Sequence, residues 1–579
     1  MHLAAAHVLL AALTMRRVAE SASFLAVALL IALAALAPFA EQARAHLWQS
    51  YAGYASPFLD ELPAGAARPP LAQRVVVVLV RGLRLAESRR MPTLNALRQR
   101  GADVTIEASP PTYRLPATFT WLSGAWPETH GVTTNNALLL SRPDTLLRAI
   151  QASGWAVAFV GSDRLYDQLG IAAQRLELVD ELEPARRDQQ AAELARGLLR
   201  DPANQVRFVL VEVGLLEDVA RSDPDSYNAA VAATDFRLRD IGEAMNLGTE
   251  TLVVLSDRGL TRDGRDGGGE AEVARAPLVM AGAGILAGAQ AVAHATSIAP
   301  TLAALAGAPI PIHAQGGPIF AALPPESALL LASARQLTTF YEQWSATLGQ
   351  PRFAAELLRR YEDRLATGDA AAYTVWLAEL NRLVAAAVGA RLAAERTARL
   401  PFVAGICLLL LIIAGLLLNA RVAAPLIGAL VYLGAWLTFF FALRQGSLSL
   451  SLFLDGDPAP TFEEWERLSA MLMMAACAIV AITTGRQERV FDAVATVLSA
   501  LGLVVVAQLI VFMGFYWQWG DVFTWTLPDS SMLVAVLLAL TQVAALTMPL
   551  TPGLPDLPVA LLAAVAGALI HVVVRRPSL

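Results

Sequence analysis

The basic side chains of this sequence are all arginines, which narrows the chemistry that it can perform. The 579 residues include 44 that are Lys or Arg, and every one of them is Arg. A chain without lysine cannot form a Schiff base, use a lysine general base or build a P-loop. Its two cysteines, Cys407 and Cys477, lie in apolar stretches and provide neither a disulfide framework nor a cysteine-ligated metal site. The formal net charge of −6 offers no basic excess for binding nucleic acid.

Short β-branched runs alternate with stretches rich in Leu, Ala and Arg between about residues 71 and 320. Continuous apolar strands separated by helices predict a parallel sheet covered by helices on both faces, an α/β domain of roughly 250 residues. The expected strands are Arg74–Val80, Ala156–Val160, Val206–Val213, Thr251–Leu255 and Pro277–Ala281.

Apolar segments dominate the rest of the chain. Only 16% of the residues are charged, against about 25% in an ordinary soluble domain, which predicts a membrane protein with a soluble part. The uncharged run 22–40 predicts an N-terminal membrane anchor behind an extension of residues 1–14. A signal peptide cleaved near Ala43-Arg-Ala45 is the alternative. Six further spans are expected at about 401–419, 422–443, 468–484, 491–516, 531–550 and 557–574.

These patterns divide the chain into four parts. Between the soluble part and the later spans, apolar residues at helical spacing predict two or three amphipathic helices. The expected parts are an extension and anchor (1–45), an α/β domain (46–326), an amphipathic helical connector (327–400) and a C-terminal membrane domain of about six spans (401–579).

Arginines near the apolar segments predict the orientation in a plasma (cytoplasmic) membrane. Arg16 and Arg17 precede the anchor, so the positive-inside rule puts the N-terminus in the cytoplasm and the α/β domain on the extracytoplasmic side. Seven spans would leave Arg575 and Arg576 outside. Either one span is miscounted or this tail departs from the rule.

Short motifs follow one another at the expected strand ends: Val75-Val-Val-Val-Leu-Val-Arg81-Gly, Met91-Pro-Thr-Leu-Asn, Pro110-Pro-Thr-Tyr-Arg114-Leu-Pro116, Pro127-Glu-Thr-His130-Gly, Ser256-Asp257-Arg258-Gly and Ile298-Ala-Pro300-Thr-Leu. Over residues 71–321 this ordered series resembles the alkaline phosphatase superfamily, and within it the type I phosphodiesterase/nucleotide pyrophosphatase group. The resemblance implies an alkaline-phosphatase-like parallel-sheet sandwich domain, with two zinc ions and a Thr or Ser nucleophile. The overall layout is similar to that of the GPI ethanolamine phosphate transferases.

The resemblance also implies seven functional positions, of which this chain keeps one, Asp257. The other six carry unexpected residues: Arg81 at a metal-binding Asp, Arg114 at the nucleophile, Gly214 and Asp218 at an Asp and His pair, and Arg258 and Asp266 at two histidines. Over residues 71–321 the chain holds only three histidines, His130, His294 and His313, and none matches a ligand position. We therefore expect no zinc and no other cofactor.

The resemblance predicts that Arg81, Arg114 and Arg258 converge where the two cations would lie. Asp218, Asp257 and Asp266 are expected nearby. An internal salt-bridge cluster is the favoured interpretation, because three arginines and three aspartates can neutralise one another. A metal-free pocket that binds a phosphate or lipid headgroup through the three arginines is the alternative. Calcium or magnesium bound by the aspartates would be repelled by the arginines.

Three other features are interpreted as structural. Thr112 and Thr118 could replace the nucleophile, but a turn and a helix cap or packing contact are favoured. The loop Gly264-Arg-Asp-Gly-Gly-Gly269 lacks the lysine and the context of a phosphate-binding loop, so a flexible surface turn is expected. The mixed charges from Glu177 to Arg187 predict a solvated face.

Together these observations predict a membrane-anchored, catalytically degenerate phosphodiesterase-like protein. Such a pseudoenzyme would act as a structural or interaction subunit of a membrane assembly. Its expected partners are the lipid bilayer, other membrane-protein subunits and, if the arginine pocket is open, a phosphate or lipid headgroup. The competing hypothesis is an active phosphoethanolamine-type transferase or phosphodiesterase with a rebuilt site.

Overall fold

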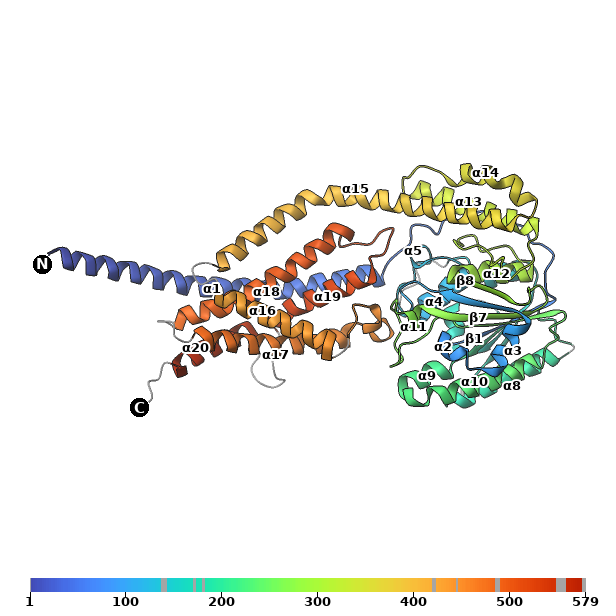
Figure 1. The fold of residues 1–579 in the computed structure, drawn as a ribbon, viewed down its shortest axis with the longest axis horizontal. Helices are drawn as coiled ribbons and strands as arrows, with labels where there is room; N and C mark the ends of the chain where they lie inside the picture. Colours follow the sequence, from blue (N-terminus) through green and yellow to red (C-terminus); the bar gives the residue numbers. More distant parts are fainter. Residues whose placement is uncertain are drawn as a thin grey trace.

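A mixed sheet with helices on both faces and a bundle of long apolar helices lie at opposite ends of the molecule (Figure 1). This computed structural model describes residues 2–136, 143–169, 173–179, 183–201, 203–418, 423–443, 446–484, 490–547 and 559–574. The predicted α/β domain and the predicted helical membrane domain are both present.

The sheet has eight strands in the order β4-β3-β5-β1-β6-β7-β2-β8. Their bounds are β1 Arg74–Val80, β2 Ala102–Glu107, β3 Val157–Gly161, β4 Arg175–Leu178, β5 Phe208–Val213, β6 Glu250–Leu255, β7 Arg275–Gly282 and β8 Ala289–His294. Five of them match the expected strands. The other three, β2, β4 and β8, contain exposed or half-exposed residues and few continuous apolar runs, which is why the sequence pattern missed them.

One strand corrects the expectation of a parallel sheet. β7 runs antiparallel to both of its neighbours, β6 and β2, whereas every other pairing in the sheet is parallel. A parallel return requires a crossover of a dozen or more residues, usually a helix. The segment between β6 and β7 contains only the short α11 (Ala271–Ala274) and is otherwise loop, so β7 turns back beside β6.

The central strand β1 supplies side chains to two separate cores. Val75, Val77 and Leu79 pack on one face with α6 and α12, while Val76 and Val78 pack on the other with α3, α8, α9 and α10. Alternate side chains of a strand point to opposite faces, so an uninterrupted valine run suits a sheet buried on both sides. The helices of this domain are α2 Leu85–Ser88, α3 Pro92–Arg100, α4 Arg114–Ser123, α5 Pro127–His130, α6 Leu146–Ala152, α7 Asp163–Leu169, α8 Pro184–Arg200, α9 Leu215–Ser222, α10 Tyr227–Gly242 and α12 Ile298–Ala306.

Five described helical segments are long and apolar enough to cross a membrane, which supports a multi-pass membrane protein. They are Ala26–Ala52 of α1 (His2–Ala52), Ala370–Leu418 (α15), Ala423–Leu443 (α16 Ala423–Leu437 and a π-helical continuation), Ala459–Thr483 of α17 (Ala459–Thr484) and Val490–Trp519 (α18). The two last expected spans appear as the shorter α19 (Ser530–Ala544) and α20 (Val559–Val574). Residues 548–558, where these two spans were expected to end and begin, lie outside the description.

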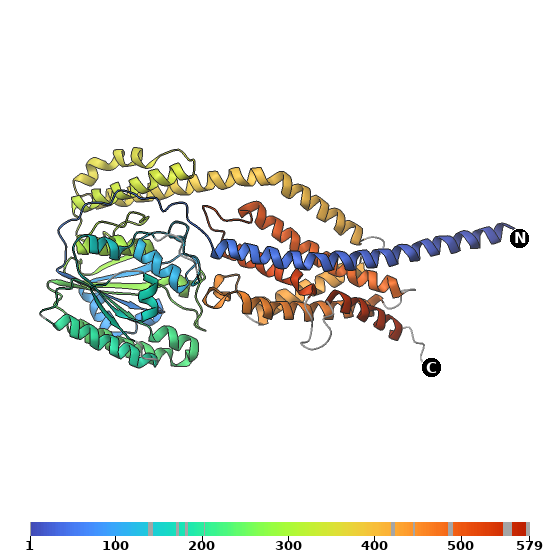
Figure 2. The same ribbon diagram turned by 180° about the vertical axis from the view of Figure 1, so that it is seen from behind.

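The ends of the chain and the connector also differ from the expected division. Residues 2–14 form the start of α1 rather than a separate extension. The connector helices are α13 Ser327–Thr347, α14 Ala354–Ala366 and α15, and α15 continues through the boundary expected at residues 400 and 401. In Figures 1 and 2, the start of α1 and the end of α20 both lie at the end of the helical domain that faces away from the sheet. Arg575 and Arg576 lie outside the described residues.

A loop of the helical domain, residues 446–457, packs directly against the α/β domain. Tyr113 donates its hydroxyl hydrogen bond to the carbonyl of Leu450 over 2.7 Å, and the Gly268 N–H donates to Ser451 Oγ over 3.0 Å. Gly267 and Gly268 are buried under this contact. The glycine loop 264–269 is therefore not the flexible surface turn that its composition predicts, because a segment remote in the sequence covers it.

Replacing Gly268 with valine tests this contact. A Cβ at Gly268 would lie 1.8 Å from Ser449 Oγ and 2.7 Å from Ser451 Oγ, so these side chains of the loop must shift and the hydrogen bond to Ser451 is disturbed. We expect Gly268→Val to lower the free energy of unfolding by about 1–3 kcal/mol through overpacking, measured as a lower thermal midpoint of the full chain in detergent. The matched control is Gly197→Val, because a Cβ at Gly197 meets nothing within 4 Å. Equal midpoints for the two variants would contradict the contact.

Candidate functional site

The charged cluster lies at the carboxyl ends of parallel strands, where open α/β sheets usually bind ligands. Arg81 follows β1 directly, Asp257 follows β6 by two residues, and Glu212 is the one charged residue of β5. Because β1 pairs with both β5 and β6, these three side chains are brought to the same edge. The loop between β6 and β7 adds Asp266 from the side of the helical domain.

Asp257 is held between two arginines. Its Oδ2 accepts a hydrogen bond from Arg81 Nη1 at 2.9 Å, and its Oδ1 accepts one from Arg258 Nη1 at 3.0 Å. Thr118 Oγ1 lies 3.3 Å from Asp257 Oδ2 and accepts from Arg81 Nη1 at 3.2 Å. All four side chains are buried. Asp257, which the resemblance predicts as a metal ligand, thus has both carboxylate oxygens bonded to guanidinium groups.

Arg258 is the most completely paired side chain of the cluster. Besides Asp257, it donates from Nε to Asp266 at 2.7 Å and from Nη2 to Glu217 at 2.9 Å. Its side chain is 0% exposed. Burial disfavours its charge, but the three carboxylates outweigh burial and raise the pKa of Arg258. No nitrogen of Arg258 is therefore available to an external anion, which corrects its expected place in an anion pocket.

Two of the three acidic partners of Arg258, Glu217 and Asp266, differ in the direction of their pKa shift. Burial alone would raise the pKa of Glu217, but the charges of Arg258, Arg221, Arg81 and Arg114 together lower it to about 2. For Asp266, burial outweighs Arg258 and raises the pKa. Glu217 is accordingly the firmly ionised member of the pair.

Arg81 bonds carboxylates through two of its three guanidinium nitrogens, because Nη1 pairs with Asp257 and Nε with Glu212. Its Nε donates to Glu212 Oε1 at 2.8 Å, and Glu212 Oε2 accepts from the hydroxyl of Ser162 at 2.6 Å. The side chain is 2% exposed, yet no described residue forms a hydrogen bond with its Nη2. Burial opposes the charge of Arg81, but Asp257 and Glu212 overcome it and raise the pKa.

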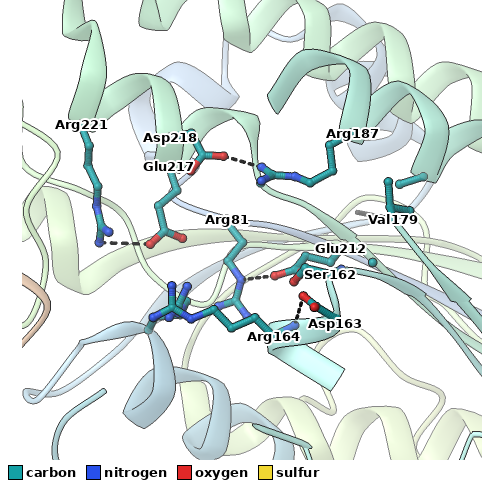
Figure 3. Close-up of a pocket in the computed structure, with 14 residues that line it drawn as sticks. Arg81, Ser162, Asp163, Arg164, Val179, Arg187, Glu212, Glu217, Asp218 and Arg221 are labelled. Carbon is teal, nitrogen blue, oxygen red and sulfur yellow. Dashed lines mark hydrogen bonds and ion pairs between the residues drawn. The ribbon is translucent and has the colours of Figure 1, made fainter. Parts of the chain in front are cut away.

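A cavity of about 320 Å³ opens beside Arg81. Figure 3 shows Arg81 directed at Glu212, Arg187 directed at Asp218, and Arg221 directed at Glu217, which lies four residues before it on α9. The lining residues that carry charge are Arg81, Arg114, Asp163, Arg164, Arg187, Glu212, Glu217, Asp218 and Arg221.

Arg114 lines this cavity and is half-buried. Within the part of the chain that the structure describes, its guanidinium has no carboxylate partner. Arg114 begins α4, and its buried Nε has no hydrogen-bond partner. Burial, together with the positive charges of Arg81, Arg164 and Arg258, lowers the pKa of Arg114 to about 10 although Glu217 acts in the opposite direction. It therefore remains protonated at neutral pH and carries an unneutralised charge.

Two expected members of the cluster line the cavity but take no part in the pairing around Asp257. Asp218 pairs with Arg187 on the outer side of α9, whereas its neighbour Glu217 faces the cluster. Consecutive helical residues point about 100° apart, so an error of one position in the motif assignment moves a side chain from rim to interior. Gly214 contributes no side chain, and its N–H donates to Asp188 Oδ1 at 2.9 Å.

Sequence reasoning missed six charged residues of the site, of which Asp163 and Arg164 lie on the short α7 at its mouth. Glu212 had a usable signal, because a lone carboxylate inside an apolar strand must be paired when buried. Glu217, Arg187 and Arg221 had none, since they lie on ordinary amphipathic helices or in the charge run expected to be solvated. Arg221 lies 3.1 Å from Glu217, 3.5 Å from Asp266 and 2.9 Å from Asp455 of the helical domain.

The residues at this edge do not fit a pair of zinc ions. Among the described residues, no three His, Cys, Asp or Glu side chains are grouped so as to hold a metal ion. His130 bonds Thr120 Oγ1 at 3.0 Å and accepts from the Val132 N–H, and burial lowers its pKa to about 3. His313 bonds the Asp60 carbonyl instead. His294 contacts the ring of Trp126, away from the cluster.

Removing Arg258 tests how far the cluster stabilises the fold. We expect Arg258→Leu to lower the free energy of unfolding by about 3–5 kcal/mol, because it leaves three buried carboxylates without their shared cation. The exposed Arg262 of the same loop is the matched control, and Arg262→Leu should change stability by less than about 0.5 kcal/mol. Chemical denaturation of the full chain in detergent measures both. Similar midpoints would mean that Arg258 is dispensable.

Comparison with known proteins adds the following. No curated protein matches the chain significantly. One similar solved structure is a 2-O GAG sulfatase, with 13% identity, a TM-score of 0.36 and an alignment that covers 43% of this chain and 73% of the other. Another is an alkaline phosphatase superfamily protein from Vibrio parahaemolyticus, with 14% identity, a TM-score of 0.34 and coverage of 48% and 78% of the two chains. A third is an inactive murine ectonucleotide pyrophosphatase/phosphodiesterase 5 in complex with AMP, with 12% identity, a TM-score of 0.34 and coverage of 41% and 96%. Likeness this distant carries no information about the substrate of this chain.

The family model for type I phosphodiesterase / nucleotide pyrophosphatase matches residues 75–167, which include Arg81 and Arg114. The match begins in β1 and ends in α7, so Glu212, Glu217, Asp257, Arg258 and Asp266 lie outside it. Over the matched residues it agrees with the resemblance that the motifs predict: this part of the chain is similar to type I phosphodiesterase / nucleotide pyrophosphatase.

Proposed function

We propose that this chain is a membrane-embedded pseudoenzyme whose phosphodiesterase-like domain binds rather than hydrolyses, as a subunit of a membrane assembly. The observation that carries the proposal is the pairing of Asp257 with Arg81 Nη1 at 2.9 Å and Arg258 Nη1 at 3.0 Å. Two guanidinium groups occupy the surroundings of the one remaining family ligand. A divalent cation there would meet like charges a few ångströms away in a buried site.

The groups available for nucleophilic attack argue in the same direction. Arg114 takes the position of the family's nucleophile, and a protonated guanidinium cannot attack phosphorus. Thr112 Oγ1 donates to the Gly268 carbonyl at 2.7 Å and accepts from the Gly267 N–H. Thr118 Oγ1 lies in the Arg81 and Asp257 contact. Both hydroxyls are buried and have structural roles. The aspartate beside Thr118, Asp257, is already paired with arginine and is therefore a poor general base.

The membrane topology belongs to the same proposal. The start of α1 and the end of α20 share one end of the helical domain (Figures 1 and 2), which suits an even number of crossings. At a rise of about 1.5 Å per residue, neither α19 nor α20 spans a hydrocarbon core of about 30 Å alone, so the two would provide one crossing together. An even count removes the conflict that Arg575 and Arg576 posed for the positive-inside rule. The α/β domain is then extracytoplasmic and both termini are cytoplasmic.

Metal content and turnover distinguish the pseudoenzyme from an active enzyme. We expect the full chain, purified in detergent without chelator, to contain well under one zinc per chain by elemental analysis. It should also show no phosphodiesterase turnover on bis(p-nitrophenyl) phosphate with or without added zinc. About two zinc ions per chain, or turnover that a chelator abolishes, would overturn the proposal and favour the transferase or phosphodiesterase.

The subunit role has its own measurement. After extraction in a gentle detergent, the native mass of the particle should exceed that of one 61.5 kDa chain. The reason is that a domain that no longer catalyses a reaction is expected to be kept for its contacts with other subunits. Subunits that co-purify at fixed stoichiometry would account for the difference. A particle with the mass of a single chain and no co-purifying protein would end the subunit hypothesis while leaving the metal result untouched.

A further inference from the structure

We propose that the cavity beside Arg81 binds a phosphate group, free or on a lipid headgroup, through Arg114 and the unpaired Nη2 of Arg81. The inference rests on the proposed function, since it assigns a ligand to a domain that does not hydrolyse one. It also revises the anion pocket expected from the sequence: Arg258 is excluded, and Arg81 and Arg114 remain.

The first support is an oriented donor without an acceptor. Arg81 Nε and Nη1 are fixed by Glu212 and Asp257, so the guanidinium plane cannot turn to satisfy Nη2 elsewhere. Nη2 is buried, lacks a partner and belongs to a side chain that lines the cavity. Leaving a buried donor unmet costs about 1–3 kcal/mol, so an oxyanion that reached Nη2 from the cavity would recover that free energy.

The second support is the charge balance within the cavity. Each carboxylate that lines its inner wall already has an arginine: Glu212 pairs with Arg81, Glu217 with Arg258 and Arg221, and Asp218 with Arg187. No described ion pair or hydrogen bond involves the guanidinium of Arg114 or of Arg164 at the mouth. An oxyanion placed between Arg114 and Arg81 would accept charge-assisted hydrogen bonds from both.

Size and surroundings select the class of ligand. A cavity of about 320 Å³ holds a phosphate with part of the molecule that carries it. The backbone N–H groups at the start of α9 are not available, because Asp188 accepts from both Gly214 and Leu215 at 2.9 Å. Recognition therefore depends on guanidinium groups, whose planar donors match phosphate oxygens. Asp163, exposed at the mouth, is the one lining carboxylate that would repel the ligand.

Arg114 is the residue to change, because Arg81 belongs to the buried cluster and its replacement would disturb the fold. The probes are inorganic phosphate and a short-chain phosphatidic acid, titrated into the full chain in detergent and followed by calorimetry. We expect wild type to bind at least one of them and Arg114→Gln to weaken that binding at least about tenfold, the loss of one charge-assisted hydrogen bond. Asp163→Asn should tighten it, and Arg262→Gln, a control outside the cavity, should leave it unchanged.

The arms of the experiment separate the possible sources and failures. Binding of inorganic phosphate assigns a free phosphate, and binding of phosphatidic acid but not of short-chain phosphatidylcholine assigns a lipid phosphate monoester. No binding of either probe, or binding equal in wild type and Arg114→Gln, overturns the inference. That result would leave the pseudoenzyme proposal intact. Turnover of a phosphodiester by the wild-type chain would instead overturn the proposed function, whatever the outcome for Arg114.

Discussion

The site depends on the carboxylate of Asp257, which accepts hydrogen bonds from both Arg81 and Arg258. Through these arginines it joins the end of β1 to the end of β6, to Glu217 on α9 and to Asp266 in the loop before β7. In a low-dielectric interior such a network is stable only as a whole, because each member that is removed exposes the others as unpaired charges. The cluster thus performs the structural part of what bound cations do elsewhere: it holds several acidic groups together at one sheet edge.

Much of this arrangement follows from the sequence. The valine run of β1, the motif order and the substitutions at Arg81, Arg114 and Arg258 predicted the fold class and the position of the cluster. Hydrophobic patterning could not predict β2 or β8, whose alternating and alanine-rich residues resemble surface sequence. It also could not predict β7's direction, which depends on the absence of a crossover helix.

The partners within the site were harder to predict than its position. Motif matching assigns one residue to each role, so it chose Asp218 and passed over Glu217, although only the latter points inward. It grouped three arginines as anion-binding, yet their pairing differs: each guanidinium nitrogen of Arg258 is bonded, Arg81 has one free donor, and Arg114 has no acidic partner among the described residues. Such differences depend on distances of a few tenths of an ångström between side chains from remote segments, and no local pattern contains them.

Arg221 links two parts of the molecule that the sequence keeps far apart. One guanidinium contacts Glu217 and Asp266 in the cluster and Asp455 in the loop of the helical domain. The contacts of Arg221 therefore contribute both to the free energy of docking the two domains and to the free energy of ordering the cluster. A change in the position of the helical domain therefore changes the electrostatics at the sheet edge. By thermodynamic reciprocity, a change at the sheet edge affects the docking of the helical domain with the same coupling free energy. The soluble domain and the bilayer-embedded domain are in this respect a single cooperative unit.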